Sequence, residues 1–296
     1  MKHVFVINPI SGKGSDKAPL IKTIQSYADR FDVDVYVTTG ELDATRFVKE
    51  YCTNHPEEEV RFYACGGDGT LNEVVNGLVG FPNAAVGVYP CGSGNDYLKA
   101  HGPKEKFLDI LGLLEGESKP VDVMRIGDRY AINACHFGFD SHVAMKIVEY
   151  RATKRDPYMS AVLYAIVHGM RTKVKIVADG ELFFEGDSLM CTICNGTHVG
   201  GSYRCAPRSV SDDGLLELCL MRTVSRLGLL SRMGLYERGE HLDSPRFKGI
   251  VEYRRCRRVE IDVPEGFGVS LDGEIIRQPH IVVENLEKAV RFVVPK

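Results

Sequence analysis

The chain has 296 residues, of which 44% are hydrophobic and 26% charged, a composition typical of a globular protein with one large or two moderate domains. Its formal net charge of -3 provides no overall basic field, so we expect no nucleic-acid partner. The N-terminal apolar run stops at Ile7, and the longest apolar helical stretch, 158–170, is shorter than the roughly 20 residues of a membrane span. We therefore expect neither a signal peptide nor a transmembrane segment.

The nine cysteines are an odd number, and most lie in apolar, strand-like runs. This pattern indicates reduced core thiols and hence a cytoplasmic protein. One pair, Cys191 and Cys194, has the CxxC spacing, but its surroundings predict a strand. Residues three apart on a strand point to opposite faces, so core packing is favoured over metal binding.

The first third of the chain alternates strand-like and helical patterns. Strands are predicted at 4–7, 33–37, 60–65 and 85–89, with helices through 20–27, at 43–51 and at 70–78. Strands separated by helices of this length form a parallel sheet with crossover helices. We expect a three-layer α/β domain, with a mostly parallel sheet, over residues 1–120.

The pattern changes near residue 120, where strand-like runs begin to dominate. They lie at 121–126, 130–137, 174–178, 188–194, 215–221 and 258–263, with helices at 140–150 and 158–170. Asp-Gly turns separate several of these runs. We expect a mainly antiparallel, β-sandwich-like domain over residues 121–284, while residues 285–296 pack back onto the first domain.

Residues 66–70, Gly-Gly-Asp-Gly-Thr, join a predicted buried strand to a predicted helix. The glycines let the backbone approach an anion closely, and a helix N-terminus adds free N–H groups and partial positive charge. Asp68 could instead be an ordinary capping residue in a plain turn. Such a run arises by chance in roughly a few of ten thousand chains of this length, so phosphate binding is favoured.

Two further glycine loops follow predicted strands. Residues 8–14 read Asn-Pro-Ile-Ser-Gly-Lys-Gly, and residues 90–96 read Pro-Cys-Gly-Ser-Gly-Asn-Asp. Neither has the spacing of a Walker A loop. Three such loops would line one edge of a parallel sheet, which is where ligands bind in open α/β folds.

These motifs resemble the successive signatures of the diacylglycerol kinase catalytic family, and more closely the soluble bacterial lipid kinases related to sphingosine and ceramide kinases. The resemblance rests on Asn8-Pro-x-Ser-Gly, Gly66-Gly-Asp-Gly-Thr-Leu-Asn-Glu73 and Gly92-Ser-Gly-Asn-Asp96. It continues through Asn195-Gly196, Gly200-Gly201, Pro207, Asp212-Asp213-Gly214-Leu215 and Leu271-Asp272-Gly273-Glu274. It therefore covers nearly the whole chain in order.

The resemblance implies a function and a set of site residues. The chain would be a kinase that transfers the γ-phosphoryl group of ATP to a hydroxyl of a membrane lipid, diacylglycerol first among them. The implied ATP-binding residues are Asn8, Pro9, Ile10, Ser11, Gly12, Lys13, Thr38, Gly66, Gly67, Asp68, Gly69, Thr70, Leu71, Asn72 and Ser93. Asp272 and Glu274 would form the catalytic acidic pair, and which of them accepts the hydroxyl proton stays open.

The resemblance also implies two uses of Mg²⁺. One ion would sit in a structural loop, held by the carboxylate of Asp213 and the carbonyls of Val210 and Leu215, because oxygen ligands suit Mg²⁺. A second would travel with ATP, with Asp68 as a partner, and neutralise phosphate charge.

A lipid substrate implies peripheral contact with the inner face of the membrane, in a role in phospholipid biosynthesis. The densest basic cluster contains Arg254, Arg255, Arg257 and Arg258, which could face anionic lipid or simply form an exposed strand. The alternatives left open are an NAD kinase-like phosphotransferase, which shares the Gly-Gly-Asp-Gly run, and a non-enzymatic nucleotide-sensing module. The identity of the lipid and the oligomeric state, a homodimer included, are not indicated.

Overall fold

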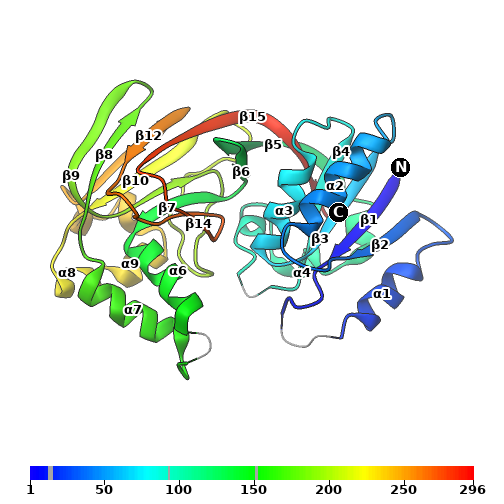
Figure 1. Ribbon diagram of the computed structural model, residues 1–296, viewed down its shortest axis with the longest axis horizontal. Helices are drawn as coiled ribbons and strands as arrows, with labels where there is room; N and C mark the ends of the chain where they lie inside the picture. The colour runs from blue at the N-terminus through cyan, green and yellow to red at the C-terminus, as the bar shows by residue number, and fades with distance from the viewer. Residues whose placement is uncertain (13–15, 93, 151–152) are drawn as a thin grey trace. The chain divides into compact units, whose positions relative to one another are not determined.

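The computed structural model describes residues 1–12, 16–92, 94–150 and 153–296. It divides into two compact units (Figure 1). The N-terminal unit comprises Met1–Val123 and Leu286–Lys296, and the C-terminal unit comprises Met124–Asn285. Two strands, β5 (Glu117–Ile126) and β15 (His280–Val294), contain residues of both units.

The N-terminal unit is built on a parallel sheet. Its strands are β1 (Lys2–Ile7), β2 (Asp32–Val37), β3 (Val60–Gly66) and β4 (Ala84–Pro90), in the spatial order β2-β1-β3-β4. The last part of β15 pairs in parallel with β4 through Arg291 and Phe292. Phe5, Phe62 and Phe292 are completely buried, as expected for strands covered on both faces.

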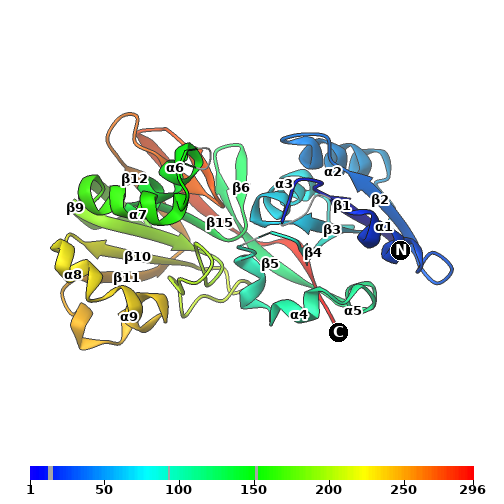
Figure 2. The same cartoon turned by 90° about the horizontal axis from the view of Figure 1, so that it is seen from below.

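Helices complete this unit. They are α1 (Ala18–Gln25), α2 (Asp43–Asn54), α3 (Asp68–Leu78), α4 (Lys104–Phe107), α5 (Ile110–Leu114) and the 3₁₀ turn η1 (Tyr97–Ala100). Figure 2 shows β1, β3 and β4 between α2 and α3 on one side and α4 and α5 on the other. A carboxylate oxygen of Glu73 on α3 accepts the N–H of Ala44 at 3.2 Å, which supplies the start of α2 with an acceptor. The predicted three-layer α/β arrangement is confirmed.

The C-terminal unit is antiparallel. Its strands are β6 (Arg129–Ala131), β7 (Ala134–Gly138), β8 (Thr172–Ala178), β9 (Glu181–Cys194), β10 (Leu216–Arg222), β11 (Val251–Cys256), β12 (Arg258–Asp262), β13 (Val269–Leu271) and β14 (Glu274–Ile276). The long strand β9 pairs with β8 through its first part and with β7 and β10 through its last part. The predicted β-sandwich-like class is confirmed.

Two apolar clusters hold this unit together. One lies among the strands, and the other lies where the helices pack on the sheet. Those helices are α6 (Phe139–Tyr150), α7 (Pro157–His168), α8 (Arg226–Leu230) and α9 (Met233–Glu237), with 3₁₀ turns η2 (Glu240–Leu242) and η3 (Pro245–Phe247). Cys191 belongs to the first cluster and Cys194 to the second, so the CxxC pair does point to opposite faces. All nine cysteines lie in the described part of the chain, and each is a free thiol.

The structure differs from the prediction at residues 130–137, which were expected to form one strand. The strand is interrupted at Ile132 and Asn133, between β6 and β7. The N–H groups of these two residues donate to the carboxylate of Asp272 instead of to a neighbouring strand. The short helices α8 and α9 were also not predicted. Within the described residues, no helix is long and apolar enough to span a membrane.

Candidate active site

The three glycine loops of the N-terminal unit meet at the carboxyl ends of β1, β3 and β4. The Asn8 side-chain amide donates to the Thr70 hydroxyl at 3.2 Å, which links the first loop to the second. The carbonyl of Gly66 accepts the N–H groups of Cys91 and Gly92, both at 2.9 Å, which links the second loop to the third. The three loops are therefore tied into one surface at the edge of the sheet.

Glycine is required at two contacts between these loops. A Cβ on Gly92 would lie 2.4 Å from the Cα of Gly67, and a Cβ on Gly12 would lie 2.3 Å from the carbonyl oxygen of Cys91. Backbone atoms cannot move aside as a flexible side chain can. The glycine pattern thus serves close packing of the loops as well as the approach of a ligand.

Asp68 organises the third loop. Its Oδ1 accepts the backbone N–H of Asp96 at 2.6 Å, and a Cβ on Gly94 would lie 2.7 Å from its Oδ2. Within the loop, Asn95 has a left-handed backbone (φ 47°), and its side-chain amide donates to the Gly92 carbonyl at 2.6 Å. The position of this loop therefore depends directly on Asp68.

The N-terminus of α3 lies at the same edge of the sheet, directly after β3. Its N-cap is Gly67, which has no side chain to accept a hydrogen bond from the first turn. The first four N–H groups of a helix have no intrahelical partner, and the helix dipole favours an anion there. The Thr70 side chain in this first turn is 6% exposed and bonded to Asn8. This end of α3 can hold a phosphate group with backbone donors.

Thr38 follows β2 at the same edge of the sheet. Its N–H donates to the Ile7 carbonyl at 2.9 Å, and its side chain is buried. The next turn is held by Asp43, whose carboxylate accepts the N–H and hydroxyl of Thr39 and the hydroxyl of Tyr36. The hydrogen bond from the Thr39 backbone N–H is the main reason that the pKa of Asp43 is lowered to about 2. Sequence reasoning missed Asp43, because only the fold shows what its carboxylate contacts.

The other predicted ATP-binding residues differ in exposure. Ile10 is 88% exposed, and the Ser11 hydroxyl donates to the Asn8 carbonyl at 2.9 Å. Leu71 and Asn72 are buried in α3, so they support the second glycine loop by packing in the interior. The predicted residues Lys13 and Ser93 lie outside the described residues.

In the C-terminal unit, Asp272 stands in the turn between β13 and β14, with a left-handed backbone (φ 46°). Its Oδ2 accepts the N–H of Ile132 at 2.7 Å, and its Oδ1 accepts the N–H groups of Asn133 at 3.1 Å and Ala134 at 2.8 Å. Backbone donors stabilise the charged carboxylate and fix its orientation. An oriented carboxylate is what a general base requires.

Glu274, the second predicted acidic residue, is in a different environment. It is exposed on β14, and its carboxylate forms an ion pair with Arg129 at 3.3 Å. Exposed ion pairs hold their partners only loosely. Asn133 was not predicted as a site residue, although it interrupts an apolar run in the sequence. Its backbone N–H donates to Asp272, and its side-chain amide donates to the His198 carbonyl at 3.0 Å. The structure therefore holds the Asp272 carboxylate in a more fixed orientation than that of Glu274.

The predicted magnesium loop provides oxygen donors, but its carboxylate is already bonded. Asp213 Oδ1 accepts the N–H of Leu215 at 3.1 Å, and Oδ2 accepts from the Arg255 guanidinium. Arg255 also pairs with the buried Glu217 at 2.9 Å. Among the described residues, no three His, Cys, Asp or Glu side chains are grouped to hold a metal. Oxygen donors suit Mg²⁺, but an ion bound here would have to replace Arg255 at Asp213.

The arginine cluster, comprising Arg254, Arg255, Arg257 and Arg258, is largely compensated by acidic side chains. Three of its members form ion pairs, and their partners include Glu181, Glu217 and Glu284. Compensated arginines attract an anionic surface less than isolated ones. The structure therefore gives this cluster little net charge for membrane binding.

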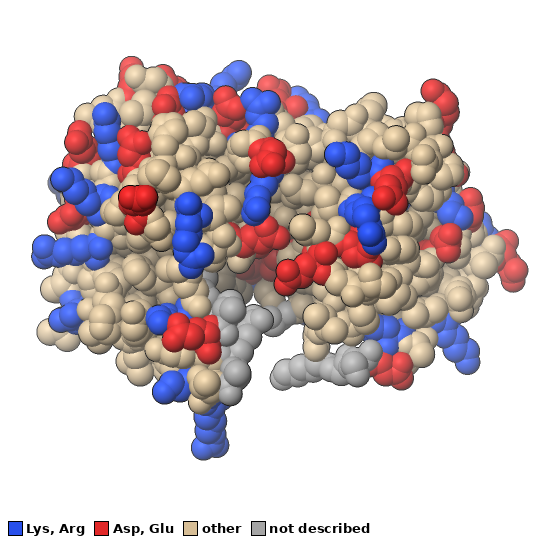
Figure 3. Space-filling view, in the orientation of Figure 1, with Lys and Arg blue, Asp and Glu red and all other residues tan. Residues whose placement is uncertain are grey.

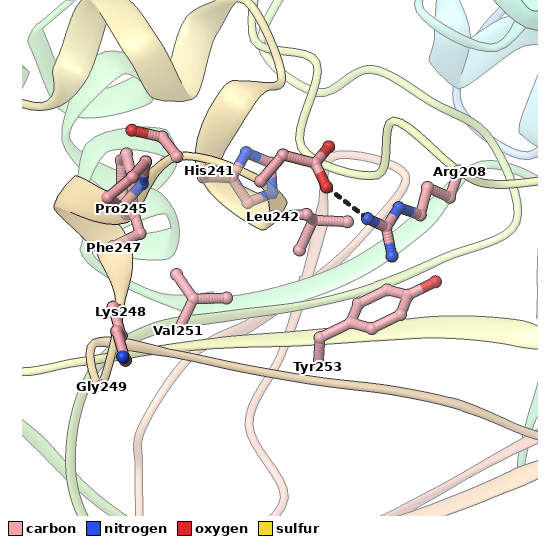
Figure 4. Close-up of a pocket in the computed structure, with 11 residues that line it drawn as sticks. Arg208, His241, Leu242, Pro245, Phe247, Lys248, Gly249, Val251 and Tyr253 are labelled. Carbon is pink, nitrogen blue, oxygen red and sulfur yellow. Dashed lines mark hydrogen bonds and ion pairs between the residues drawn. The ribbon is translucent and has the colours of Figure 1, made fainter.

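A separate pocket of about 560 Å³ lies between the segment 241–249 and β11 (Figure 4). Its rim carries the ion pair between Arg208 and Asp243, at 2.5 Å. Inside, burial lowers the pKa of His241 to about 4, and the ring donates to the Cys205 carbonyl at 3.1 Å. The pocket contains none of the predicted site residues.

A parallel sheet with glycine loops at its edge, followed by an antiparallel β domain, is the architecture of a class of kinases, and comparison with known proteins identifies the family. Residues 2–126 match the diacylglycerol kinase catalytic domain, and residues 133–294 match the YegS C-terminal NAD kinase beta sandwich-like domain. The chain belongs to the diacylglycerol kinase and YegS-like lipid kinase family, and it is a kinase.

Individual relatives agree with this family. A diacylglycerol kinase of Bacillus subtilis is 29% identical, with 100% of this chain and 97% of the relative covered. A Shewanella frigidimarina protein named "Probable lipid kinase YegS-like" is also 29% identical, covering 100% of this chain and 94% of that protein.

Solved structures show the same fold. A diacylglycerol kinase from Bacillus anthracis aligns with a TM-score of 0.74 at 21% identity, over 100% of this chain and 97% of that chain. An NAD kinase from Archaeoglobus fulgidus, in complex with ATP, aligns with a TM-score of 0.54 at 15% identity, over 100% of this chain and 94% of that chain.

Proposed function

We propose that this kinase transfers the γ-phosphoryl group of ATP to a hydroxyl of a membrane lipid, with diacylglycerol as the substrate. The observation that carries the proposal is the Asp272 carboxylate, oriented by backbone N–H groups in a chain of the lipid kinase family. In this reaction Asp272 accepts the proton of the lipid hydroxyl. The hydroxyl oxygen then bonds to the γ-phosphorus, and ADP leaves with the electrons of the broken P–O bond.

The N-terminal unit supports the ATP part of the proposal. The start of α3 provides backbone N–H groups for phosphate oxygens, and the loops after β1 and β4 and Thr38 lie at the same edge of the sheet. Mg²⁺ arriving with ATP would neutralise phosphate charge. Asp68 is our candidate partner for that ion, and Val210, Asp213 and Leu215 are our candidates for a structural one.

We place the reaction in the cytoplasm, at the inner face of the membrane, where ATP and a lipid hydroxyl meet. The test incubates the purified chain with γ-labelled ATP and, in separate reactions, diacylglycerol vesicles, a total lipid extract and NAD. Label in phosphatidic acid supports the proposal, and mass spectrometry of the extract identifies any other lipid product. Label in NADP alone would overturn the proposal in favour of an NAD kinase, whose fold this chain shares.

A further inference from the structure

Helix α7 has apolar side chains on opposite faces. Ala161 and Ala165 are completely buried in the apolar cluster under the helices. Met159, Leu163 and Val167 lie on another face at intervals of four residues, and they are 50%, 58% and 55% exposed. Helices of soluble proteins usually turn polar residues outward, so an outward apolar stripe indicates a binding surface.

The apolar surface continues onto α8. Leu227 and Leu230 are 79% and 51% exposed. The guanidinium of Arg226, at the start of α8, donates to the carbonyls of Ile166 at 2.8 Å and Val167 at 3.1 Å, which holds α8 against the end of α7. Figures 1 and 2 show the two helices side by side. We call the five exposed residues Met159, Leu163, Val167, Leu227 and Leu230 the α7–α8 apolar surface.

Basic residues flank α7 and α8 in the chain. Residues 154–175 contain five Lys and Arg against one Asp, and residues 224–238 contain three Arg against one Glu, in a chain whose net charge is -3. Figure 3 shows the region of α7 and α8 as mostly uncharged surface, with several Lys and Arg and an acidic group around it. In contrast to the arginine cluster, Lys154, Arg171 and Arg226 form no ion pair with any carboxylate in the described part of the chain.

We propose that the α7–α8 apolar surface docks on an anionic lipid bilayer, with its leucine, methionine and valine side chains among the acyl chains and its basic rim against the headgroups. Apolar burial and attraction to anionic lipid act together in such interfacial helices. The inference rests on the proposed function, and it assigns membrane contact to these helices and not to the arginine cluster.

Charge argues against a second copy of the chain as the occupant. A twofold dimer places the same patch on both subunits, so two basic rims would face each other. Repulsion between like charges disfavours that contact. A bilayer containing phosphatidylglycerol provides both the apolar layer and the opposite charge.

The test measures co-sedimentation of the full chain with vesicles of phosphatidylcholine alone, or mixed with phosphatidylglycerol, without ATP. Leu163→Ser is compared with Leu182→Ser, because both leucines belong to the C-terminal unit and both are 58% exposed. We expect Leu163→Ser to reduce partitioning into mixed vesicles about tenfold, as expected for a lost apolar anchor. Leu182→Ser should bind as the wild type does.

The basic rim is tested with Arg171→Gln, compared with Lys22→Gln on α1. Arg171→Gln should lower partitioning into mixed vesicles about fivefold, and should have no effect with phosphatidylcholine alone. Equal binding of Leu163→Ser and wild type would overturn the proposal. A change of oligomeric state in Leu163→Ser, with vesicle binding unchanged, would overturn it in favour of self-association.

A second readout separates this proposal from the proposed function. Activity of Leu163→Ser is measured on diacylglycerol in mixed vesicles and on a short-chain diacylglycerol dissolved as monomers. Activity lost only on vesicles supports docking. Because the binding assay contains no ATP, it decides the docking proposal even if diacylglycerol proves not to be the substrate.

Discussion

The Asp272 carboxylate lies 2.8 Å from the backbone nitrogen of Ala134, which is 138 residues earlier in the chain. This contact joins the β13–β14 turn to the interrupted edge between β6 and β7. The interruption and the carboxylate explain each other, because the N–H groups lost from a strand pairing are the ones that hold Asp272. A turn aspartate thereby becomes a fixed group in the sheet.

Replacement of Asp68 by alanine should weaken ATP binding. The Asp68 carboxylate accepts the N–H of Asp96 at 2.6 Å, so its loss releases the backbone at Asp96. We expect the Kd for ATP to rise about tenfold, the equivalent of one charged hydrogen bond of roughly 1.5 kcal/mol. Isothermal titration with ATP measures this. Asp109→Ala is the matched control, because Asp109 accepts a backbone N–H at 3.1 Å in the same unit. Equal Kd values for Asp68→Ala and wild type would contradict the prediction.

Gly92→Ala should disturb the same surface for a steric reason. Its Cβ would lie 2.4 Å from the Cα of Gly67, so the second and third loops would have to separate. We expect lower ATP affinity and a lower melting temperature. Gly40→Ala provides the control, because nothing lies within 4 Å of a Cβ at that position. If both variants bound ATP like the wild type, close packing of these loops would not matter for the site.

Asp43→Asn should make the free energy of unfolding less dependent on pH in the acidic range. The pKa of Asp43 is lowered from 3.8 to about 2 in the folded chain, so its charge stabilises the fold above the unfolded pKa. That stability is lost as the pH falls through about 2.

The expected difference is about 1 to 3 kcal/mol at neutral pH, because the Thr39 donors lose a charged acceptor. Unfolding by urea at a series of pH values measures it. The gap between wild type and variant should narrow below about pH 4. A gap that stays constant down to the lowest pH would show that packing, and not charge, is responsible.

Arg255→Gln should strengthen binding of Mg²⁺ at Asp213, because the guanidinium competes for the same carboxylate. Thermal melting with and without Mg²⁺ should show a larger stabilising shift in Arg255→Gln than in wild type. Asp213→Asn should show none. Arg222→Gln, which breaks the ion pair of Arg222 with Glu252, controls for loss of an ion pair in the same pair of strands. No Mg²⁺-dependent shift in Arg255→Gln would contradict a metal site in this loop.

The sequence was sufficient to predict the features that depend on local pattern. The alternation of strands and helices predicted the parallel sheet, and the glycine runs predicted the loops at its edge, since backbone geometry limits which residues fit there. The interruption at Asn133 was not predictable, because it depends on a carboxylate far along the chain. Asp43 was missed for a different reason: its partners Tyr36 and Thr39 are close in the chain, but the sequence does not show that a carboxylate accepts their hydrogen bonds.

Charge clusters were harder to interpret from sequence. The arginine cluster is dense in the chain, but its acidic partners come from other strands, as Glu181 does from β9 and Glu284 from β15. The exposed apolar side chains of α7 were also not predictable from the sequence. An apolar helix predicts burial, and only the structure shows that Leu163 faces outward.

The most direct test of the account compares Asp272→Asn with Asp179→Asn in phosphoryl transfer from labelled ATP to diacylglycerol. Asp179 is the matched control: it also stands in a left-handed Asp-Gly turn (φ 50°), and its carboxylate accepts the N–H groups of Arg257 and Arg258 at 3.0 and 2.9 Å. Asp272→Asn should lower kcat by about 10²- to 10⁴-fold, the usual contribution of a general base, while ATP binding changes little. Its melting temperature should fall, as that of Asp179→Asn should, because an amide nitrogen cannot accept the N–H groups that the carboxylate accepts. Asp179→Asn should retain activity. Equal activity of Asp272→Asn and wild type would contradict the account.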